Sequence, residues 1–161
     1  MKSIFAIIVV FTLLLSGASC ARAQESSPLL GKAFPDFTLE RSEGASVSLS
    51  QLIKDKKAIV FFFATWCPHC REQINVITAK KALFKEQGIT VVLVNIGETR
   101  AKVKKFRTEH GLDNDILLDQ NSFVAETYQV MGVPMLVFIG TDGKVRYVEY
   151  GLPDNYAEIL K

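Results

Sequence analysis

The sequence has few cysteines, few histidines and almost no net charge. Its 161 residues include three cysteines and two histidines, and 19 basic side chains stand against 17 acidic ones. Two of the basic residues, Lys2 and Arg22, lie in the first 23 residues, so the rest of the chain is formally neutral. A neutral domain has no overall electrostatic attraction for nucleic acid. We therefore exclude nucleic acid as a partner and expect one globular domain.

The first 23 residues have the layout of a bacterial secretory signal. Lys2 precedes an apolar run at residues 4–15, and small residues follow at 16–18. Cleavage after Ala23 would release the mature chain, whereas lipid attachment at Cys20 or an uncleaved anchor would hold it at the membrane. All three alternatives place residues 24–161 outside the cytoplasm, in the periplasm.

The exported part alternates predicted strands and helices. Residues 24–33 have no clear period and are expected to be a tether, and residues 34–161 are expected to form the domain. Apolar runs and turn residues predict strands at 36–39, 46–49, 58–63, 89–96, 135–139 and 145–150. Helices are expected at 68–87, 100–110, 122–131 and 155–160. This order predicts an α/β fold, a three-layer α/β/α sandwich with a mixed central sheet.

Two of the three cysteines stand close together, in Trp66-Cys67-Pro68-His69-Cys70. A purely structural disulfide is a poor explanation, because it would close almost no loop. A zinc site would need four ligands, and only His69 and His110 could supplement the thiolates. The pattern favours a redox-active pair, while a metal site and an inert disulfide remain alternatives.

The position of the pair agrees with redox chemistry. A buried strand runs into the helix at Cys67, which is expected to be the N-cap residue at the carboxyl edge of the sheet. Pro68 then takes the first helical position, where its missing N–H costs nothing. The helix dipole and a protonated His69 favour a thiolate on Cys67. Cys70 lies one turn further on the same face, so we expect Cys67 to attack and Cys70 to resolve.

Several motifs resemble those of exported thioredoxin-like proteins of the TlpA/ResA group. These are the CPHC run after an apolar strand, Gly132-Val133-Pro134 before the next, and residues 31–39 and 94–98. The similarity covers residues 31–161 and implies a thioredoxin fold with an N-terminal strand extension. It further implies a cis Val133–Pro134 bond and a Val133 backbone that pairs with a substrate strand. Trp66 is expected to be an apolar rim for the substrate.

Two positions depart from that group. Phe61 stands where thioredoxins often have a buried carboxylate, and Gln73 stands where ResA-like proteins have Glu. The dipeptide Pro68-His69 matches that of the oxidising enzyme DsbA, whose reduction potential is about −120 mV against about −270 mV for thioredoxin. The relatives therefore suggest a reductant, whereas the dipeptide argues for a more oxidising couple.

The sequence predicts an extracytoplasmic thiol–disulfide oxidoreductase that works in cytochrome c maturation or periplasmic disulfide handling. We expect a monomer without bound cofactor or metal that exchanges electrons with protein dithiol or disulfide substrates and an upstream redox partner. The alternative is a copper-handling carrier that uses Cys67 and Cys70 as soft ligands. A dense basic stretch at residues 100–107 is expected to be a solvated helix face.

Overall fold

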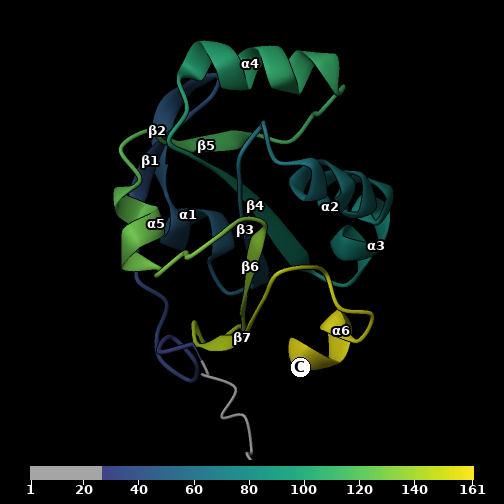
Figure 1. The fold of residues 1–161 in the computed structure, drawn as a ribbon. Coiled ribbons are helices and arrows are strands. Elements are labelled where there is room, and N and C mark those ends of the chain that lie inside the picture. The colour runs from purple at the N-terminus through teal and green to yellow at the C-terminus, as the bar shows by residue number, and fades with distance from the viewer. Residues whose placement is uncertain (1–26) are drawn as a thin grey trace, which may run out of the picture.

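A mixed sheet forms the centre of the molecule. The computed structural model describes residues 27–161, and the expected leader, Cys20 and the first residues of the tether lie outside this range. Within it, seven strands follow the order β2-β1-β5-β4-β3-β6-β7 (Figure 1). The strands are β1 Thr38–Arg41, β2 Gly44–Ser48, β3 Lys57–Phe63, β4 Ile89–Ile96, β5 Ile116–Asp119, β6 Met135–Ile139 and β7 Val145–Glu149. Strands β3, β4 and β5 run parallel, and their other neighbours are antiparallel.

Helices cover both faces of this sheet, as the sequence predicted (Figure 1). They are α1 Leu49–Ile53, α2 Pro68–Ala79, α3 Lys81–Glu86, α4 Arg100–Glu109, α5 Phe123–Thr127 and α6 Tyr156–Ile159. Side chains of α2, α3, α4 and α6 share one apolar cluster, and those of α1 and α5 share another. The three-layer α/β/α sandwich is therefore confirmed.

Strand β3 explains how the two clusters meet at the sheet. Successive side chains of a strand point to opposite faces. Ile59, Phe61 and Phe63 accordingly join the cluster under α2, whereas Ala58 and Val60 join the one under α1. All of them are fully buried, as expected for an uninterrupted apolar strand with both faces covered. This buried strand carries the chain directly to Cys67.

The predicted helix 68–87 is wrong, because it is two helices. Lys80 ends α2 with φ −89° and ψ 4° and starts α3, although no Gly or Pro signals a break. The predicted helix 122–131 is also too long, since α5 ends at Thr127 and Gln129 adopts a φ of 54°. Such a φ leaves the right-handed helical region.

The amino end of the domain also differs from the prediction. Residue 49, expected at the end of a strand, begins α1, because Ser48 caps that helix by accepting a hydrogen bond from the N–H of Gln51 at 3.2 Å. Strand β5 was not predicted, since four residues give too short a periodic signal. It joins the predicted N-terminal hairpin β1–β2 to the central sheet through antiparallel pairing with β1.

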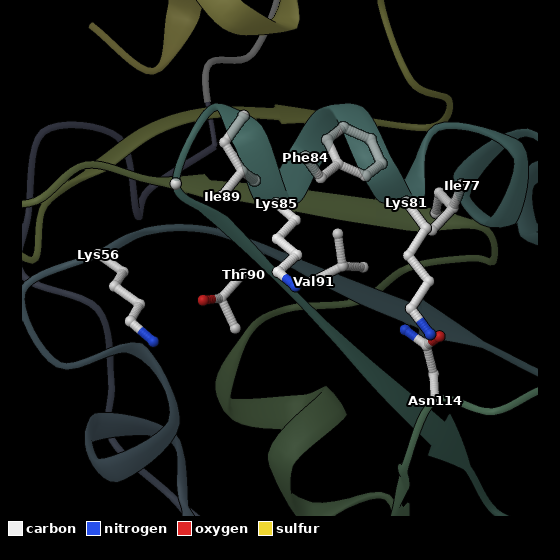
Figure 2. Close-up of a pocket in the computed structure, with 10 residues that line it drawn as sticks. Lys56, Ile77, Lys81, Phe84, Lys85, Ile89, Thr90, Val91 and Asn114 are labelled. Atoms are coloured by element: carbon white, nitrogen blue, oxygen red, sulfur yellow. The ribbon is translucent and has the colours of Figure 1, made fainter.

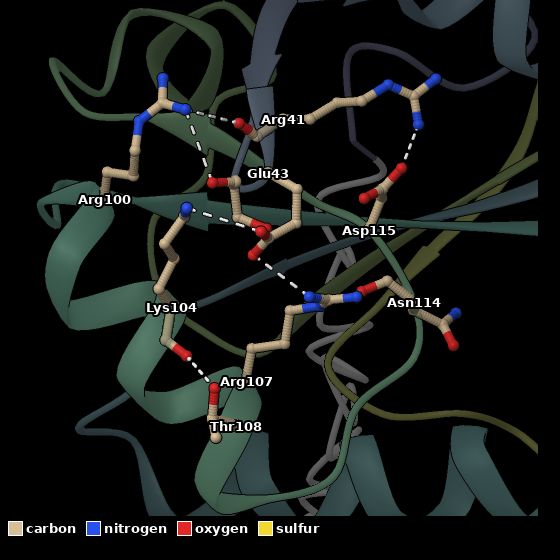
Figure 3. A network of polar contacts seen from close by, with 9 residues as sticks. Arg41, Glu43, Arg100, Lys104, Arg107, Thr108, Asn114 and Asp115 are labelled. Carbon is tan, nitrogen blue, oxygen red and sulfur yellow. Dashed lines mark hydrogen bonds and ion pairs between the residues drawn. The ribbon is translucent and has the colours of Figure 1, made fainter. Parts of the chain in front are cut away.

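Helix α4 uses its basic side chains to hold that hairpin (Figure 3). Lys104 and Arg107 reach the Glu43 carboxylate at 3.5 and 3.1 Å, and Arg100 pairs with Glu40. Arg100 also donates to the Arg41 carbonyl at 3.2 Å. Basic side chains that were expected on a solvated face therefore pair with acidic residues of the chain's own β1–β2 hairpin.

The described end of the expected tether lies against the last strand. Leu29 is buried, and the backbone N–H of Gly31 donates to the Val145 carbonyl at 2.8 Å. The N–H of Val145 in turn donates to the Lys32 carbonyl at 2.9 Å. Among residues 27–161, no helix has the length and apolar character needed to cross a bilayer.

Candidate active site

The cysteine pair lies where strand β3 passes into helix α2. Cys67 is the N-cap residue of α2, with extended backbone angles of φ −81° and ψ 115°, and Pro68 takes the first helical turn. The N–H of Cys67 donates to the Ala64 carbonyl at 3.2 Å, which fixes the turn out of the strand. This arrangement confirms the helix start predicted from the sequence and directs the free N–H groups of the first turn toward the Cys67 sulfur.

The two thiols face each other across this first turn. The backbone N–H of Cys70 donates to Sγ of Cys67 at 3.2 Å, and the Cys67 thiol donates to the Val133 carbonyl at 3.6 Å. Both side chains are free thiols in the structure. Cys67 is 4% exposed and Cys70 is fully buried. The difference in solvent exposure is small. What distinguishes the two sulfurs is that Cys67 lies at the start of α2 and accepts a hydrogen bond from its backbone.

The surroundings of Cys70 keep it protonated. Burial raises the pKa of the Cys70 thiol to about 12, and the hydrogen bond with Cys67 acts in the same direction. The nearby charges of Cys67 and Glu98 add to the effect. At neutral pH the second cysteine is therefore a thiol that ionises only when its surroundings change.

A buried carboxylate, Glu98, lies behind the pair. Its Oε2 accepts from the Thr65 N–H at 2.6 Å and from Nδ2 of Asn95 at 2.7 Å. Its Oε1 accepts from Oγ1 of Thr65 at 2.7 Å and lies 2.6 Å from Nζ of Lys102. Only 7% of the residue is exposed. Glu98 thus joins the loop after β4 to the residues that lead into Cys67.

Burial acts to raise the pKa of Glu98, but hydrogen bonds from Asn95, Lys102 and Thr65 outweigh it and lower the pKa from its ordinary value. The residue therefore stays charged. In the sequence Glu98 stands only within the motif at residues 94–98, which predicts no role for it in the site. A carboxylate two residues after a buried strand was the available signal, because charged residues that become buried are normally paired.

Other residues singled out in the sequence point elsewhere. The side chain of His69 is 80% exposed and its imidazole lies 3.2 Å from the Glu72 carboxylate, with no hydrogen bond to Cys67 among residues 27–161. The carboxamide of Gln73 accepts from the Leu152 N–H at 2.9 Å and so ties α2 to the segment after β7. Neither side chain offers a proton acceptor to Cys70.

A shallow groove borders the pair on its other side. The Val133–Pro134 peptide bond is cis and Pro134 is buried at the start of β6. Trp66 is 65% exposed and Met131 is 88% exposed, and with Val133 they line a groove of about 300 Å³. The structure therefore brings Trp66 and Val133 beside Cys67, together with Met131, which the sequence did not single out.

Within residues 27–161, no three side chains of His, Cys, Asp or Glu gather closely enough to hold a metal ion. His110, the other candidate ligand, stacks on Phe106 at the end of α4. The two histidines thus do not join the thiols in the structure.

A thioredoxin-type sheet that presents a CxxC pair at a helix start beside a cis proline defines the thioredoxin-fold thiol–disulfide oxidoreductases. The chain belongs to the AhpC/TSA family, whose model matches residues 30–148.

Individual relatives agree with this class. The chain is 33% identical over 121 residues to the thiol-disulfide oxidoreductase ResA of Bacillus subtilis, covering 75% of this chain and 67% of ResA. A thioredoxin domain of a thiol-disulfide oxidoreductase from Bacteroides vulgatus superimposes with a TM-score of 0.71 at 26% identity, covering 81% of this chain and 94% of that one. A thiol:disulfide interchange protein from Chlorobium tepidum gives 0.68 at 25% identity, with 80% and 94% covered. The chain is thus a thiol–disulfide oxidoreductase of this type, which implies protein substrates and redox partners.

Proposed function

We propose that Cys67 is the attacking sulfur and Cys70 the resolving sulfur of an extracytoplasmic thiol–disulfide oxidoreductase. The observation that carries this proposal is the hydrogen bond from the Cys70 N–H to Sγ of Cys67 at the start of α2. Backbone donors and the helix dipole stabilise negative charge on that sulfur, and the thiolate is the nucleophile in exchange. Cys70, with its raised pKa, keeps its proton until it is needed.

The exchange then proceeds in two steps. The Cys67 thiolate attacks one sulfur of a substrate disulfide, which forms a mixed disulfide and releases the first substrate sulfur as a thiolate. Cys70 gives its proton to the released substrate thiolate and attacks Sγ of Cys67, which releases the second substrate sulfur as a thiolate and leaves a Cys67–Cys70 disulfide. Two electrons have passed to the substrate, and the reverse sequence oxidises a dithiol.

The groove beside the pair is suited to a protein substrate. Val133 presents its backbone next to Cys67, and Trp66 and Met131 offer exposed apolar surface on the same side. An extended substrate strand that contacts Val133 would bring its disulfide to the Cys67 sulfur. In this proposal Pro68 and Pro134 complete the surroundings of the sulfur, and the exposed His69 follows in the first turn of α2.

The leader at residues 1–23 supports a location outside the cytoplasm, in the periplasm, with the chain soluble or held at the membrane. We propose that the domain acts as a monomer on exported proteins, in cytochrome c maturation or in periplasmic disulfide handling, and that an upstream dithiol protein resets it.

Replacing Cys70 with Ser tests this mechanism, because the mixed disulfide then has no resolving thiol. Non-reducing gels of the extracytoplasmic fraction should show adducts between this variant and substrate proteins. The double variant Cys67→Ser/Cys70→Ser is the control and should show none. A folded Cys70→Ser protein with a reactive Cys67 and no adducts would contradict the proposal, and tightly bound copper in the reduced protein would favour the carrier alternative.

A further inference from the structure

The first half of strand β4 has an open side. β4 pairs with β3 from Ile89 to Asn95, but its pairing with β5 begins only at Leu93. No hydrogen bond outside the ladders reaches Ile89–Val92 among the described residues. Because backbone groups of successive strand residues alternate between the two neighbours, two of these four residues present N–H and C=O groups to the open side.

A groove lies along this open stretch (Figure 2). Its volume is about 360 Å³, and Ile77, Phe84 and Ile89 contribute buried apolar surface. Thr90 and Val91 lie at its centre and are half-buried. We call the set of lining residues the β4 groove; it is formed by Lys56, Ile77, Lys81, Phe84, Lys85, Gly88, Ile89, Thr90, Val91 and Asn114.

Three lysines give the β4 groove a positive rim. Lys85 extends from α3 toward Thr90 and Val91, Lys81 extends from the same helix toward Asn114, and Lys56 lies on the other side of Thr90 (Figure 2). Lys81 pairs with Asp113, an exposed pair that contributes little. Lys56 and Lys85 have no acidic partner among the described residues.

We propose that the β4 groove binds an extended acidic segment of a partner protein by adding it as a strand to the open side of β4. Unpaired strand groups are a template for main-chain hydrogen bonds, and alternate side chains of the added strand would enter the apolar floor. Carboxylates on the segment would meet the unpaired ammonium groups of Lys56 and Lys85. A small anionic amphiphile would use the lysines and the floor but would leave the strand groups unpaired, so the open strand favours a peptide.

This site lies at the opposite end of β4 from the cysteine pair. Ile89 begins the strand, and Glu98 lies two residues beyond its end at Ile96, so the two places are on the order of 20 Å apart at about 3.3 Å per residue. A partner held in the β4 groove therefore leaves Cys67 and the groove at Val133 free for exchange. The acidic segment would hold the partner protein on the domain while Cys67 and Cys70 exchange a disulfide in another part of the same partner.

The test uses a fluorescein-labelled peptide, acetyl-Thr-Glu-Val-Glu-Val-Glu-amide, and fluorescence anisotropy with the purified protein. The peptide should bind, and a version with every Glu replaced by Lys should not. Lys56→Glu/Lys85→Glu should weaken binding of the acidic peptide by up to about fivefold per lysine, the size of an exposed ion pair. The same variant should gain affinity for the lysine peptide. Lys105→Glu on α4 is the control and should leave the affinities for both peptides unchanged.

Two further measurements separate the proposal from its rivals. N-methylation of alternate peptide residues should abolish binding, and NMR should show amide shifts confined to residues 89–92 and their neighbours. Equal binding of the N-methylated peptide, or tighter binding of dodecanoate, would overturn strand addition in favour of an amphiphile site. Lysines at a sheet edge also keep like strands apart. Self-association of the double variant without any change in peptide affinity would therefore also overturn the proposal. This outcome does not depend on the oxidoreductase activity of the cysteine pair.

Discussion

The backbone N–H of Cys70 donates a hydrogen bond to Sγ of Cys67 at 3.2 Å. The main chain of the second cysteine thus stabilises charge on the first sulfur, while its own side chain is buried with a pKa of about 12. One helical turn therefore produces two thiols of different character. The difference predicts how each responds to alkylation.

Brief treatment of the reduced protein with substoichiometric iodoacetamide at neutral pH should label Cys67. Cys70 should remain unlabelled, because its raised pKa leaves almost no thiolate. In a Cys67→Ser variant, Cys70 should react only in strongly alkaline solution, and peptide mass mapping checks both results. Preferential labelling of Cys70 in the unmodified protein would reverse the assigned roles.

Glu98 should contribute to stability in a pH-dependent manner. Its hydrogen bonds hold the pKa below the ordinary value of 4.5, so the folded state binds this proton less readily than the unfolded state. The stabilisation is therefore complete above about pH 4.5 and is lost as the pH falls through the folded-state pKa. Glu98→Ala should lower the free energy of unfolding by about 2–4 kcal/mol at pH 7, since it leaves Thr65 and Asn95 without an acceptor.

Urea unfolding of wild type and Glu98→Gln between pH 3 and pH 7 provides the measurement. The stability difference between the two proteins should shrink below pH 4.5. Glu43→Gln, which removes an exposed carboxylate from the α4 contact, serves as the control and should cost about 1 kcal/mol or less. A Glu98→Gln difference that stays constant over this pH range would show that the charge of Glu98 has no such role.

The role of Glu98 could not be predicted from the sequence. The CPHC run, the strand before it and Pro134 were recognisable because their signals are local. The role of Glu98 depends on Thr65 and Lys102, which meet it only after β3, β4 and α4 have packed. The same holds for Gln73, whose position next to Leu152 depends on the segment after β7.

Among the secondary-structure elements, too, those with a long local signal were predictable and those that depend on tertiary contacts were not. Strands β3, β4 and β6 were predicted closely because their apolar runs are long. The break at Lys80 carries no Gly or Pro, and strand β5 has only four residues, so tertiary pairing rather than local pattern determines both.

The ion pair between His69 and Glu72 should adjust the reduction potential. When it is protonated, the imidazole near the start of α2 favours a thiolate on Cys67, and the Glu72 carboxylate 3.2 Å away opposes this effect. His69→Ala should therefore make the couple more reducing and Glu72→Gln more oxidising, each by on the order of 10–30 mV. Both side chains are largely exposed, so 1 M salt should reduce the shifts. Shifts of the same sign in the two variants would contradict this account.

The groove beside Cys67 should determine substrate affinity. Trp66→Ala and Met131→Ala remove exposed apolar surface next to Val133. Each should raise the KM for a protein disulfide substrate several-fold and leave the rate with a small disulfide such as oxidised glutathione unchanged. Phe123→Ala, which removes another exposed apolar side chain outside the lining of this groove, is the matched control. Equal loss with both kinds of substrate would mean that the two side chains act on the sulfur instead.

The most direct test of the account is the equilibrium of the protein with glutathione buffers of defined potential, with the Cys67–Cys70 disulfide quantified by mass spectrometry after alkylation. We predict one two-electron transition, with a midpoint above the value of about −270 mV of thioredoxin and toward the value of about −120 mV of DsbA. Replacing either cysteine with Ser should abolish the transition. Failure of the two thiols to form a disulfide at any potential would contradict the central claim, and a midpoint at or below that of thioredoxin would contradict the oxidising character inferred from Pro68-His69.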